Sequence, residues 1–388
     1  MSTPAIYLDW NATTPVLPEA VAEMLDTMQH AWANPSSTHA PGQAARRVLA
    51  DARARVAGFL GALPAELVFT SGATEANHLA VRGLLAAAPE GRRRVVFSAV
   101  EHAGHLKLAR ELMDAGVPVD FITVRTDGAL DFDAATRLIG ADVALVSLMA
   151  ANNETGVLMP VAEVAALAAA AGARLHVDAT QWVGKLPFAF SEWRADAVSF
   201  SAHKFNGPKG VGALLLRQGV TLRPTVPGSQ ERGRRGGTEN LPAITGLATA
   251  LDALGSPDEL AAEAARLAAL RDRLEGALMT ELPDVHIWCA GVPRLPGVSF
   301  LRVGRWEADV LLQRLERLGF AASSGAACSS SGSAPSHVLT AMGVPDDEAL
   351  GAVRLSLGRT TTAAEIDALI AALPTLRSLL PAADALAA

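Results

Sequence analysis

The chain has 388 residues, of which 50% are hydrophobic and 19% are charged, and it carries a formal net charge of -7 at pH 7. This composition predicts a compact globular protein and excludes a disordered polyelectrolyte. The acidic balance, with a basic run only at Arg92, Arg93 and Arg94, argues against nucleic-acid or membrane-surface partners.

Residues 65–213 contain an alternation of short β-rich runs and alanine-rich stretches, which predicts an α/β fold with a mainly parallel sheet covered by helices. Most of the runs are continuously apolar, as in strands that are buried on both faces. A crossover helix is predicted at 161–171. The seven predicted strands are 66–70, 94–98, 117–124, 143–148, 174–177, 197–201 and 212–216.

The pattern changes after Gly255. A long charged helix is predicted at 257–278, followed by β-like runs at 285–288 and 298–303 and a helix at 308–318. A chain of this length exceeds what one hydrophobic core usually organises. We therefore predict a large domain of residues 14–255 and a smaller α+β domain made of residues 1–13 and 256–388.

Three polar motifs follow predicted strands. Lys204 comes after the strand at 197–201, Asp178 comes directly after the strand at 174–177, and Thr74 lies in the Ser/Gly/Thr segment at 69–77 that opens a helix. The carboxyl edge of an α/β sheet is where ligands bind. There the three motifs would offer an amine, a carboxylate that can keep a pyridine nitrogen protonated, and a helix start for a phosphate.

Each motif has an ordinary structural explanation when it is taken alone. A lysine at a strand end is commonly an exposed turn residue, and an aspartate or a Ser-Gly-x-Thr segment commonly caps a helix. Lysine is nevertheless rare in this chain. Any Schiff-base chemistry must use one of only four positions, because arginine cannot perform it at ordinary pH. These lysines are Lys107, Lys185, Lys204 and Lys209.

With these motifs the chain closely resembles the cysteine desulfurases of the class V aminotransferase group, pyridoxal-phosphate enzymes with the aspartate-aminotransferase-like fold (fold type I). The resemblance extends from residues 7–15 to residues 353–359. It implies pyridoxal 5'-phosphate as cofactor, L-cysteine as substrate and a homodimer with shared active sites. The amino-acid sequences of segments 151–156 and 230–240 are most similar to those of the nitrogen-fixation-type branch.

The resemblance also implies a role for each matching residue. Lys204 would hold the cofactor and move protons at the substrate α-carbon, Asp178 would pair with the ring nitrogen, and His102 would stack on the ring and act in acid-base steps. Gln181 would bond the ring hydroxyl, and Asn153 would reach cofactor and substrate. The residues around the phosphate would be Ala73, Thr74, Ser201 and His203, joined by Thr238 from the partner subunit.

Arg354 matches the arginine that binds the substrate carboxylate, a task for which a planar bidentate donor is suited. Its neighbour Arg359 could be confused with it, and a strand arginine in a surface ion pair is the ordinary alternative. Two short segments depart from the family pattern, at Trp10 with Asn11 and at Gly104 with His105. Neither segment is assigned any chemistry.

Cys328 decides the reaction class. It lies among serines and glycines in 323–333, which predicts an exposed, mobile loop, whereas Cys289 lies in an apolar run and is predicted to be an inert core residue. Two cysteines are too few for a disulfide framework. The resemblance implies that Cys328 attacks the cysteine sulfur, giving L-alanine and a persulfide that supplies iron-sulfur cluster assembly or another thiolation pathway through a scaffold or other acceptor protein.

Other functions remain open at this stage. Lys204, Asp178 and Thr74 would equally serve an aminotransferase, a selenocysteine lyase or a related β-eliminating enzyme, but a transaminase needs no thiol at Cys328. A non-catalytic scaffold would have lost the lysine or the cysteine, and a lysine-dependent aldolase would leave Asp178 without a task. No metal site is predicted. The N-terminus lacks a secretory signal pattern, so we expect a cytoplasmic protein.

Overall fold

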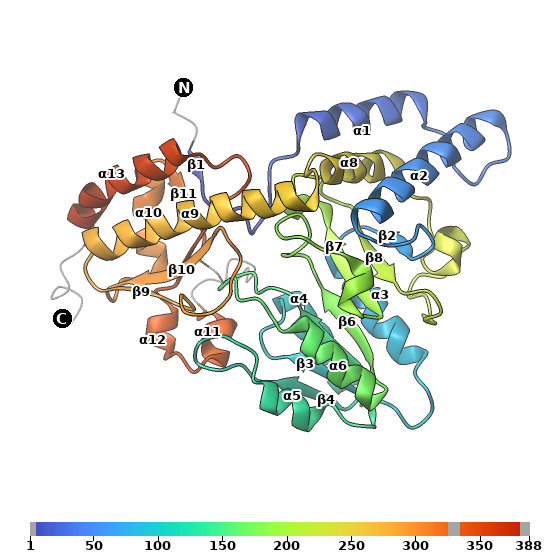
Figure 1. Cartoon of the computed structure of the whole chain (residues 1–388), viewed down its shortest axis with the longest axis horizontal. Helices are drawn as coiled ribbons and strands as arrows, with labels where there is room; N and C mark the ends of the chain where they lie inside the picture. Colours follow the sequence, from blue (N-terminus) through green and yellow to red (C-terminus); the bar gives the residue numbers. More distant parts are fainter. Residues whose placement is uncertain (1–4, 325–333, 381–388) are drawn as a thin grey trace.

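The computed structural model describes residues 5–324 and 334–380 (Figure 1). A seven-stranded sheet organises its larger part, in the order β2-β8-β7-β6-β5-β3-β4. The prediction of seven strands in this part is confirmed. Their bounds are Leu67–Thr70 (β2), Arg94–Ser98 (β3), Val119–Ile122 (β4), Val143–Met149 (β5), Arg174–Asp178 (β6), Ala197–Ser201 (β7) and Gly212–Leu216 (β8).

The sheet is parallel except around β8, which runs antiparallel to both β7 and β2. Only residues 202–211 separate β7 from β8, and so short a link returns the chain beside the strand it has just left. The link begins with a short 3-10 helix, Ala202–Lys204. Lys204 therefore lies just past the carboxyl end of β7, next to the carboxyl end of β6.

Helices cover both faces of the large sheet. Leu145 of β5 packs in a cluster with residues of α3 (Ala73–Ala86) and α4 (Ala103–Asp114), while its neighbour Val146 packs on the opposite face with residues of α6 (Val161–Ala171). Successive strand side chains point to opposite faces, so a strand covered on both sides must be apolar throughout. This explains the uninterrupted apolar runs of the sequence.

Helices α1, α2 and α8 lie together in the larger part (Figure 1). Helix α8 contacts both α1 and α2, which form one end of the molecule together with it. Their bounds are Pro18–His30 (α1), Ala40–Phe59 (α2) and Leu241–Asp252 (α8), and the shorter helices are Phe132–Leu138 (α5), Phe190–Trp193 (α7) and the 3-10 turn Gln230–Gly233.

The smaller part has its own sheet and its own apolar cluster, to which Leu8 from the beginning of the chain contributes. Its antiparallel sheet has the order β12-β10-β9, and β1 pairs with β11 in a separate two-stranded sheet. The strands are Ile6–Tyr7 (β1), Val285–Ile287 (β9), Val298–Val303 (β10), Phe320–Ala321 (β11) and Val353–Ser356 (β12). The helices are Pro257–Glu281 (α9), Ala308–Arg317 (α10), His337–Ala341 (α11), Asp346–Ala349 (α12) and Ala363–Leu379 (α13).

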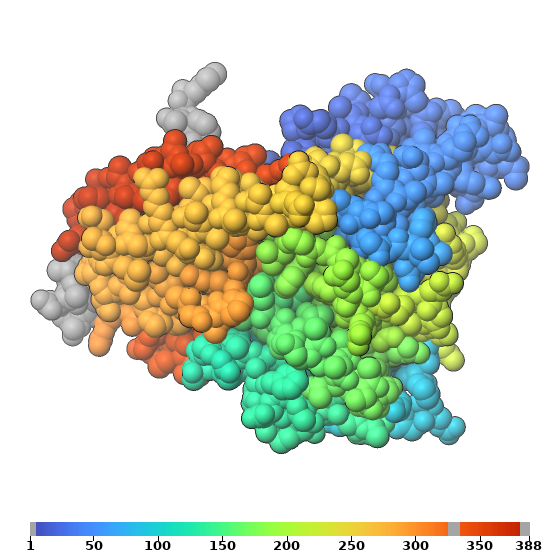
Figure 2. Space-filling view, viewed as in Figure 1, coloured from blue at the N-terminus to red at the C-terminus, as the bar shows by residue number. Residues whose placement is uncertain are grey.

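Helix α9 runs along the smaller part and reaches toward α8 of the larger part (Figure 1), and Figure 2 shows the two parts packed directly against each other. The helix begins with a capping box in which Ser256 and Glu259 bond each other's backbone. Within 5–324 and 334–380, no helix is long and apolar enough to cross a membrane.

Candidate active site

A cavity of about 630 Å³ lies where β6 and β7 end. Nearly all of the predicted site residues of the described ranges line it, although they come from distant parts of the chain. They are Ala73, Thr74, His102, Asn153, Asp178, Gln181, Ser201, His203, Lys204 and Arg354.

Lys204 is held at the edge of this cavity by the N-terminal segment. Its Nζ donates hydrogen bonds to the carbonyl oxygens of Asn11 at 2.7 Å and Ala12 at 2.8 Å. Both acceptors are neutral carbonyl oxygens, so these two hydrogen bonds orient the amine without neutralising its charge. A lysine amine held in this way is positioned to reach a carbonyl carbon in the cavity.

Asp178 ends β6 and is 6% exposed. Its Oδ2 accepts from Asn77 Nδ2 at 2.7 Å and its Oδ1 from the Thr180 backbone N–H at 2.9 Å. Burial alone would raise the pKa of Asp178, but hydrogen bonding from Thr180, the charge of His105 and the bond from Asn77 together lower that pKa. The carboxyl group is therefore ionised at neutral pH, the state that keeps a pyridine nitrogen protonated.

His102 caps the start of α4, where its Nδ1 accepts from the Gly104 N–H at 3.1 Å. Burial lowers the pKa of His102, and the charge of Lys204 adds to this effect against that of Asp178. The ring is thus neutral at neutral pH, with its proton on Nε2 because Nδ1 is an acceptor. A neutral imidazole is suited to stacking on an aromatic ring.

The first turn of α3 is built for an anion. Gly72 occupies the cap position without a side-chain hydrogen bond, so the N–H groups at the start of the helix have no side-chain acceptor there. Thr74, Ser201 and His203 line the same end of the cavity. Burial lowers the pKa of His203 to about 4, so this ring adds no charge at neutral pH. The arrangement fits a phosphate group.

The structure adds two residues, Asn11 and Lys185, to which the sequence assigned no role. The Asn11 carbonyl accepts from Gln181 Nε2 at 3.0 Å as well as from Lys204, and its Oδ1 accepts from Lys185 Nζ at 2.6 Å. Lys185 also donates to Gln181 Oε1. Burial lowers the pKa of Lys185 well below its ordinary value, and the charge of Lys204 contributes. The rarity of lysine and the four-residue spacing from Gln181 could have signalled Lys185.

Arg354, on β12, is 3% exposed and bridges the two parts of the chain. Its Nη2 donates to Asp9 Oδ1 at 2.6 Å and its Nη1 to the Asn153 carbonyl at 2.9 Å. Among the described residues, neither Arg354 Nε nor Asn153 Oδ1 has a hydrogen-bond partner. Buried polar atoms of this kind are costly unless something binds them. A polar substrate group in the cavity would satisfy both.

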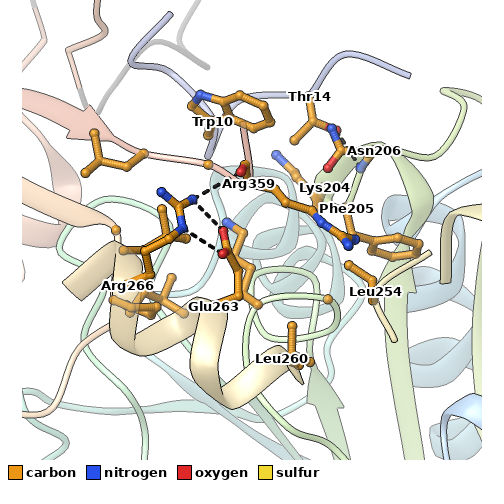
Figure 3. A pocket seen from close by; sticks show the side chains of 18 of the residues that line it. Trp10, Thr14, Lys204, Phe205, Asn206, Leu254, Leu260, Glu263, Arg266 and Arg359 are labelled. Carbon is orange, nitrogen blue, oxygen red and sulfur yellow. Dashed lines mark hydrogen bonds and ion pairs between the residues drawn. The ribbon is translucent and has the colours of Figure 1, made fainter. Parts of the chain in front are cut away.

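A second cavity of about 410 Å³ adjoins the first and shares Asn11 and Lys204 with it. Figure 3 shows that charged groups of the second cavity pair with each other. Arg266 bonds both the Glu263 carboxylate and the carbonyl of Arg359. The second cavity contains Arg359 and the larger one contains Arg354. The geometry thus favours Arg354 over Arg359 as a ligand for a substrate in the larger cavity.

Thr238 does not line the larger cavity of its own chain. It lies in a separate pocket of about 200 Å³ with Ser71, Arg235 and Asn240.

Cys289 is 8% exposed and burial raises its pKa to about 12, which confirms the predicted core residue.

Cys328 lies outside the described residues. The described residues on either side of its segment are bonded to neighbours of the site. Ser323 exchanges backbone hydrogen bonds with Arg354, Ser336 Oγ donates to Glu154 Oε2, and a ring nitrogen of His337 contacts the Glu101 carbonyl at 2.9 Å.

Comparisons with known proteins identify the family of the chain. The family Aminotransferase class-V matches residues 6–369. The chain is 47% identical to the cysteine desulfurase of Cereibacter sphaeroides over 95% of both chains, and 42% identical to that of Klebsiella pneumoniae over 95% of this chain and 92% of the other. A solved NifS-like protein has a TM-score of 0.89 and 34% identity, covering 97% of this chain and 100% of its own. The chain therefore belongs to the aminotransferase class-V family and, within it, to the cysteine desulfurases.

Proposed function

We propose that this chain is a pyridoxal 5'-phosphate-dependent enzyme that takes sulfur from L-cysteine, leaves it as a persulfide on Cys328 and releases L-alanine. The observation that carries the proposal is the meeting of an amine, a carboxylate, an uncapped helix start and a buried arginine in one cavity, at Lys204, Asp178, Thr74 and Arg354. A solved relative, 30% identical with a TM-score of 0.80, is described as SspA in complex with cysteine; it covers 91% of this chain and 98% of its own.

The residues fit the cofactor. When bound, pyridoxal phosphate supplies an electron sink for negative charge that develops at the substrate α-carbon. Lys204 would hold it covalently, Asp178 would keep its ring nitrogen protonated, and the start of α3 with Thr74 would bind its phosphate. Gln181, whose Oε1 already accepts from Lys185, presents only its Nε2 donor to the ring hydroxyl.

The substrate would be held by its carboxylate and attacked at its sulfur. Arg354 would bind the carboxylate through Nε, and Asn153 Oδ1 would accept from the substrate. Lys204 would take up the α-proton and return it. Cys328 would then form an S–S bond to the substrate sulfur as the Cβ–S bond breaks. The electron pair of that bond stays with carbon, which takes up a proton to become the methyl group of alanine.

Chain length allows Cys328 to reach the cavity. It lies five residues after Ser323, which is bonded to Arg354, and about 3.4 Å per extended residue gives a maximum reach of about 17 Å. The attacking group must be a thiolate. We propose His102 as the base that takes the thiol proton. The proton would go to Nδ1, which would give up its hydrogen bond from the Gly104 N–H.

Cys328→Ala is expected to lower the rate of sulfide release from L-cysteine, measured with a thiol reductant present, by about three orders of magnitude or more, because the acceptor of the sulfur is gone. The absorption of the bound cofactor should persist. Sulfide and alanine are measured together, and persulfide on the wild-type chain is located by mass spectrometry. Cys289→Ala is the matched control and should keep the wild-type rate. Wild-type sulfide release by Cys328→Ala would refute the proposed mechanism.

We also propose a homodimer in which Thr238 serves the partner's site. Thr238 does not line the cavity of its own chain. Val21, Leu25 and Met28 repeat at helical spacing on the outer face of α1 and are each more than half exposed, and Trp32 beyond them is 74% exposed. An apolar stripe of this kind marks an interaction surface, and a second copy of the chain would cover it.

A mixture of Lys204→Ala and Thr238→Ala chains, unfolded and refolded together, tests the shared site. If Thr238 acts across the dimer, each mixed dimer has one site with both native residues, and random pairing restores about a quarter of all sites. Desulfurase activity at limiting cofactor should therefore exceed that of either variant alone. If Thr238 acts within its own chain, mixing restores no site, and no gain in activity will be seen.

Three further proposals complete the functional picture. The large domain would comprise residues 14–255 and the small domain residues 1–13 and 256–388, which the separate apolar cluster containing Leu8, Leu274 and Leu301 supports. The enzyme would work in the cytoplasm and pass its sulfur to an iron-sulfur scaffold or another acceptor protein. To test the transfer, the persulfide form of the enzyme is prepared with isotope-labelled sulfur and incubated with a candidate scaffold protein. The label is then measured on the scaffold.

A further inference from the structure

We propose that Glu101 and His105 share a proton, and that buried hydrogen bonds, each donating toward Asp178, connect this pair to Asp178. The position of the shared proton would then influence the charge environment of Asp178. The inference rests on the proposed function, because Asp178 is the residue assigned to the cofactor ring. Glu101 and His105 would act as positioning residues. His105 belongs to a segment that departs from the family pattern, and the mechanism above does not use it.

The direction of the chain is fixed at its Asp178 end. An ionised carboxylate only accepts, so Asn77 must present its NH2 group to Asp178 Oδ2, at 2.7 Å, and its oxygen away from it. That oxygen accepts from the Ser199 hydroxyl. Because the Ser199 hydroxyl donates its hydrogen bond to Asn77, its oxygen accepts from His176 Nε2 at 3.1 Å.

His176 continues the series of hydrogen bonds with the same donor-to-acceptor direction. It is completely buried, and burial lowers its pKa to about 3, so the ring carries one proton at neutral pH. That proton is on Nε2, and Nδ1 must accept from the Ser147 hydroxyl at 2.8 Å. The Ser147 oxygen in turn faces His105 Nε2 at 3.4 Å, which is left to donate. Ser147 and Ser199 are also fully buried, so the middle of the chain is shielded from solvent.

The last contact requires one more proton. His105 Nδ1 lies 3.2 Å from Glu101 Oε2, and among the described residues neither atom has a well-aligned hydrogen-bond partner. Glu101 Oε1 already accepts from the Met149 N–H at 2.6 Å. Because His105 Nε2 is used as a donor, a proton must occupy the contact between Nδ1 and Oε2. It resides either on the carboxyl, giving two neutral groups, or on the ring, giving an ion pair.

The two positions of that proton differ in their effect on Asp178. A positive His105 lowers the pKa of Asp178, whereas burial raises the pKa of Glu101 and favours the neutral pair. The other titratable groups close to the pair are His78 on α3, His102, His337, whose ring contacts the Glu101 carbonyl, and His176 and Asp178 within the chain of hydrogen bonds. A balance between burial and these charges sets the proton position and hence the field at the cofactor ring.

Two substitutions separate a held proton from mere packing. His105→Gln keeps an N–H donor for Ser147 but cannot hold the second proton, and Glu101→Gln keeps the shape of the carboxyl but cannot exchange its proton. In both, we expect the pH midpoint of the absorption change of the bound cofactor to shift by about one pH unit or more. Glu275→Gln is the control, since Glu275 is similarly buried but pairs with Arg294 in the smaller part. The control should leave the midpoint unchanged.

The second measurement needs no cofactor and no variant. In the apoprotein with 15N-labelled histidine, NMR should show His176 as the neutral Nε2–H form down to about pH 5 and His105 with a proton on Nε2 and a second, shared proton on Nδ1. If His105 instead titrates as an ordinary solvent-exposed histidine, or has a bare Nδ1, the proposal is overturned. Equal cofactor midpoints in wild type and both variants would overturn it as well. If the NMR pattern appears but the protein binds no pyridoxal phosphate, the shared proton stands and the proposed function fails.

Discussion

Lys204→Ala is expected to lower the rate of alanine formation from L-cysteine by about four orders of magnitude or more, since it removes both the covalent attachment of the cofactor and the group that moves the α-proton. The attachment can be followed separately from the activity. Borohydride reduction of the loaded wild type, followed by peptide mass spectrometry, should place the cofactor on the peptide that contains Lys204. The same treatment of the variant should leave the cofactor unattached.

The control for this substitution is Lys107→Ala. Lys107 is exposed on α4 and lines neither of the two adjoining cavities, so its removal should leave activity and attachment unchanged. Lys185 is the informative competitor, because its buried amine shares Asn11 with Lys204. If the cofactor were found on Lys185 in wild-type protein, Lys204 would have to be reassigned.

Glu231→Gln is expected to lower the free energy of unfolding by about 3 kcal/mol, since it leaves the charge of Arg53 buried without its partner. The Glu231 carboxylate bonds both terminal nitrogens of Arg53, with Oε2 at 2.9 Å from Nη1, and Oε2 also accepts from the Phe69 N–H at 3.0 Å. Both side chains are buried. The measurement is urea denaturation of the apoprotein.

Glu111→Gln is the matched control, because Glu111 forms an ion pair with Arg82 in which both side chains are largely exposed. Breaking such a pair should change the free energy of unfolding by less than about 1 kcal/mol. If the two substitutions had equal effects on the free energy of unfolding, the buried Arg53–Glu231 pair would stabilise the fold no more than an exposed pair does. Because Glu231 ties the 3-10 turn at Gln230–Gly233 to β2, its loss should also weaken cofactor binding through the nearby Thr238.

The local pattern of the sequence was sufficient for the elements of the fold and for part of the site. Strands such as β5 and β7 are continuous apolar runs because both of their faces are covered, and that property is written in consecutive residues. Asp178 and Lys204 could be predicted to meet because carboxyl ends of neighbouring parallel strands share one edge of the sheet. The resemblance to cysteine desulfurases then supplied the remaining residues.

Only the tertiary structure decided the contacts that join distant segments. The bond from Lys204 to Asn11 spans 193 residues, and the pairing of Arg354 with Asp9 spans 345. No periodicity or spacing signals such pairs, because they depend on how the chain returns after many intervening elements. The antiparallel direction of β8 was likewise set by the short link that returns the chain beside β7.

His105 shows the difference most clearly. In the sequence it was a departure from the family pattern without a task, since nothing near it in the chain explains a histidine at that position. In the fold it faces Glu101 and joins Ser147 and His176, which come from two neighbouring strands. The sequence determined the sheet and, through its resemblance to a known family, the reaction class. The tertiary structure decided which buried polar groups pair there, because hydrogen bonds depend on distances between segments that the linear chain does not encode.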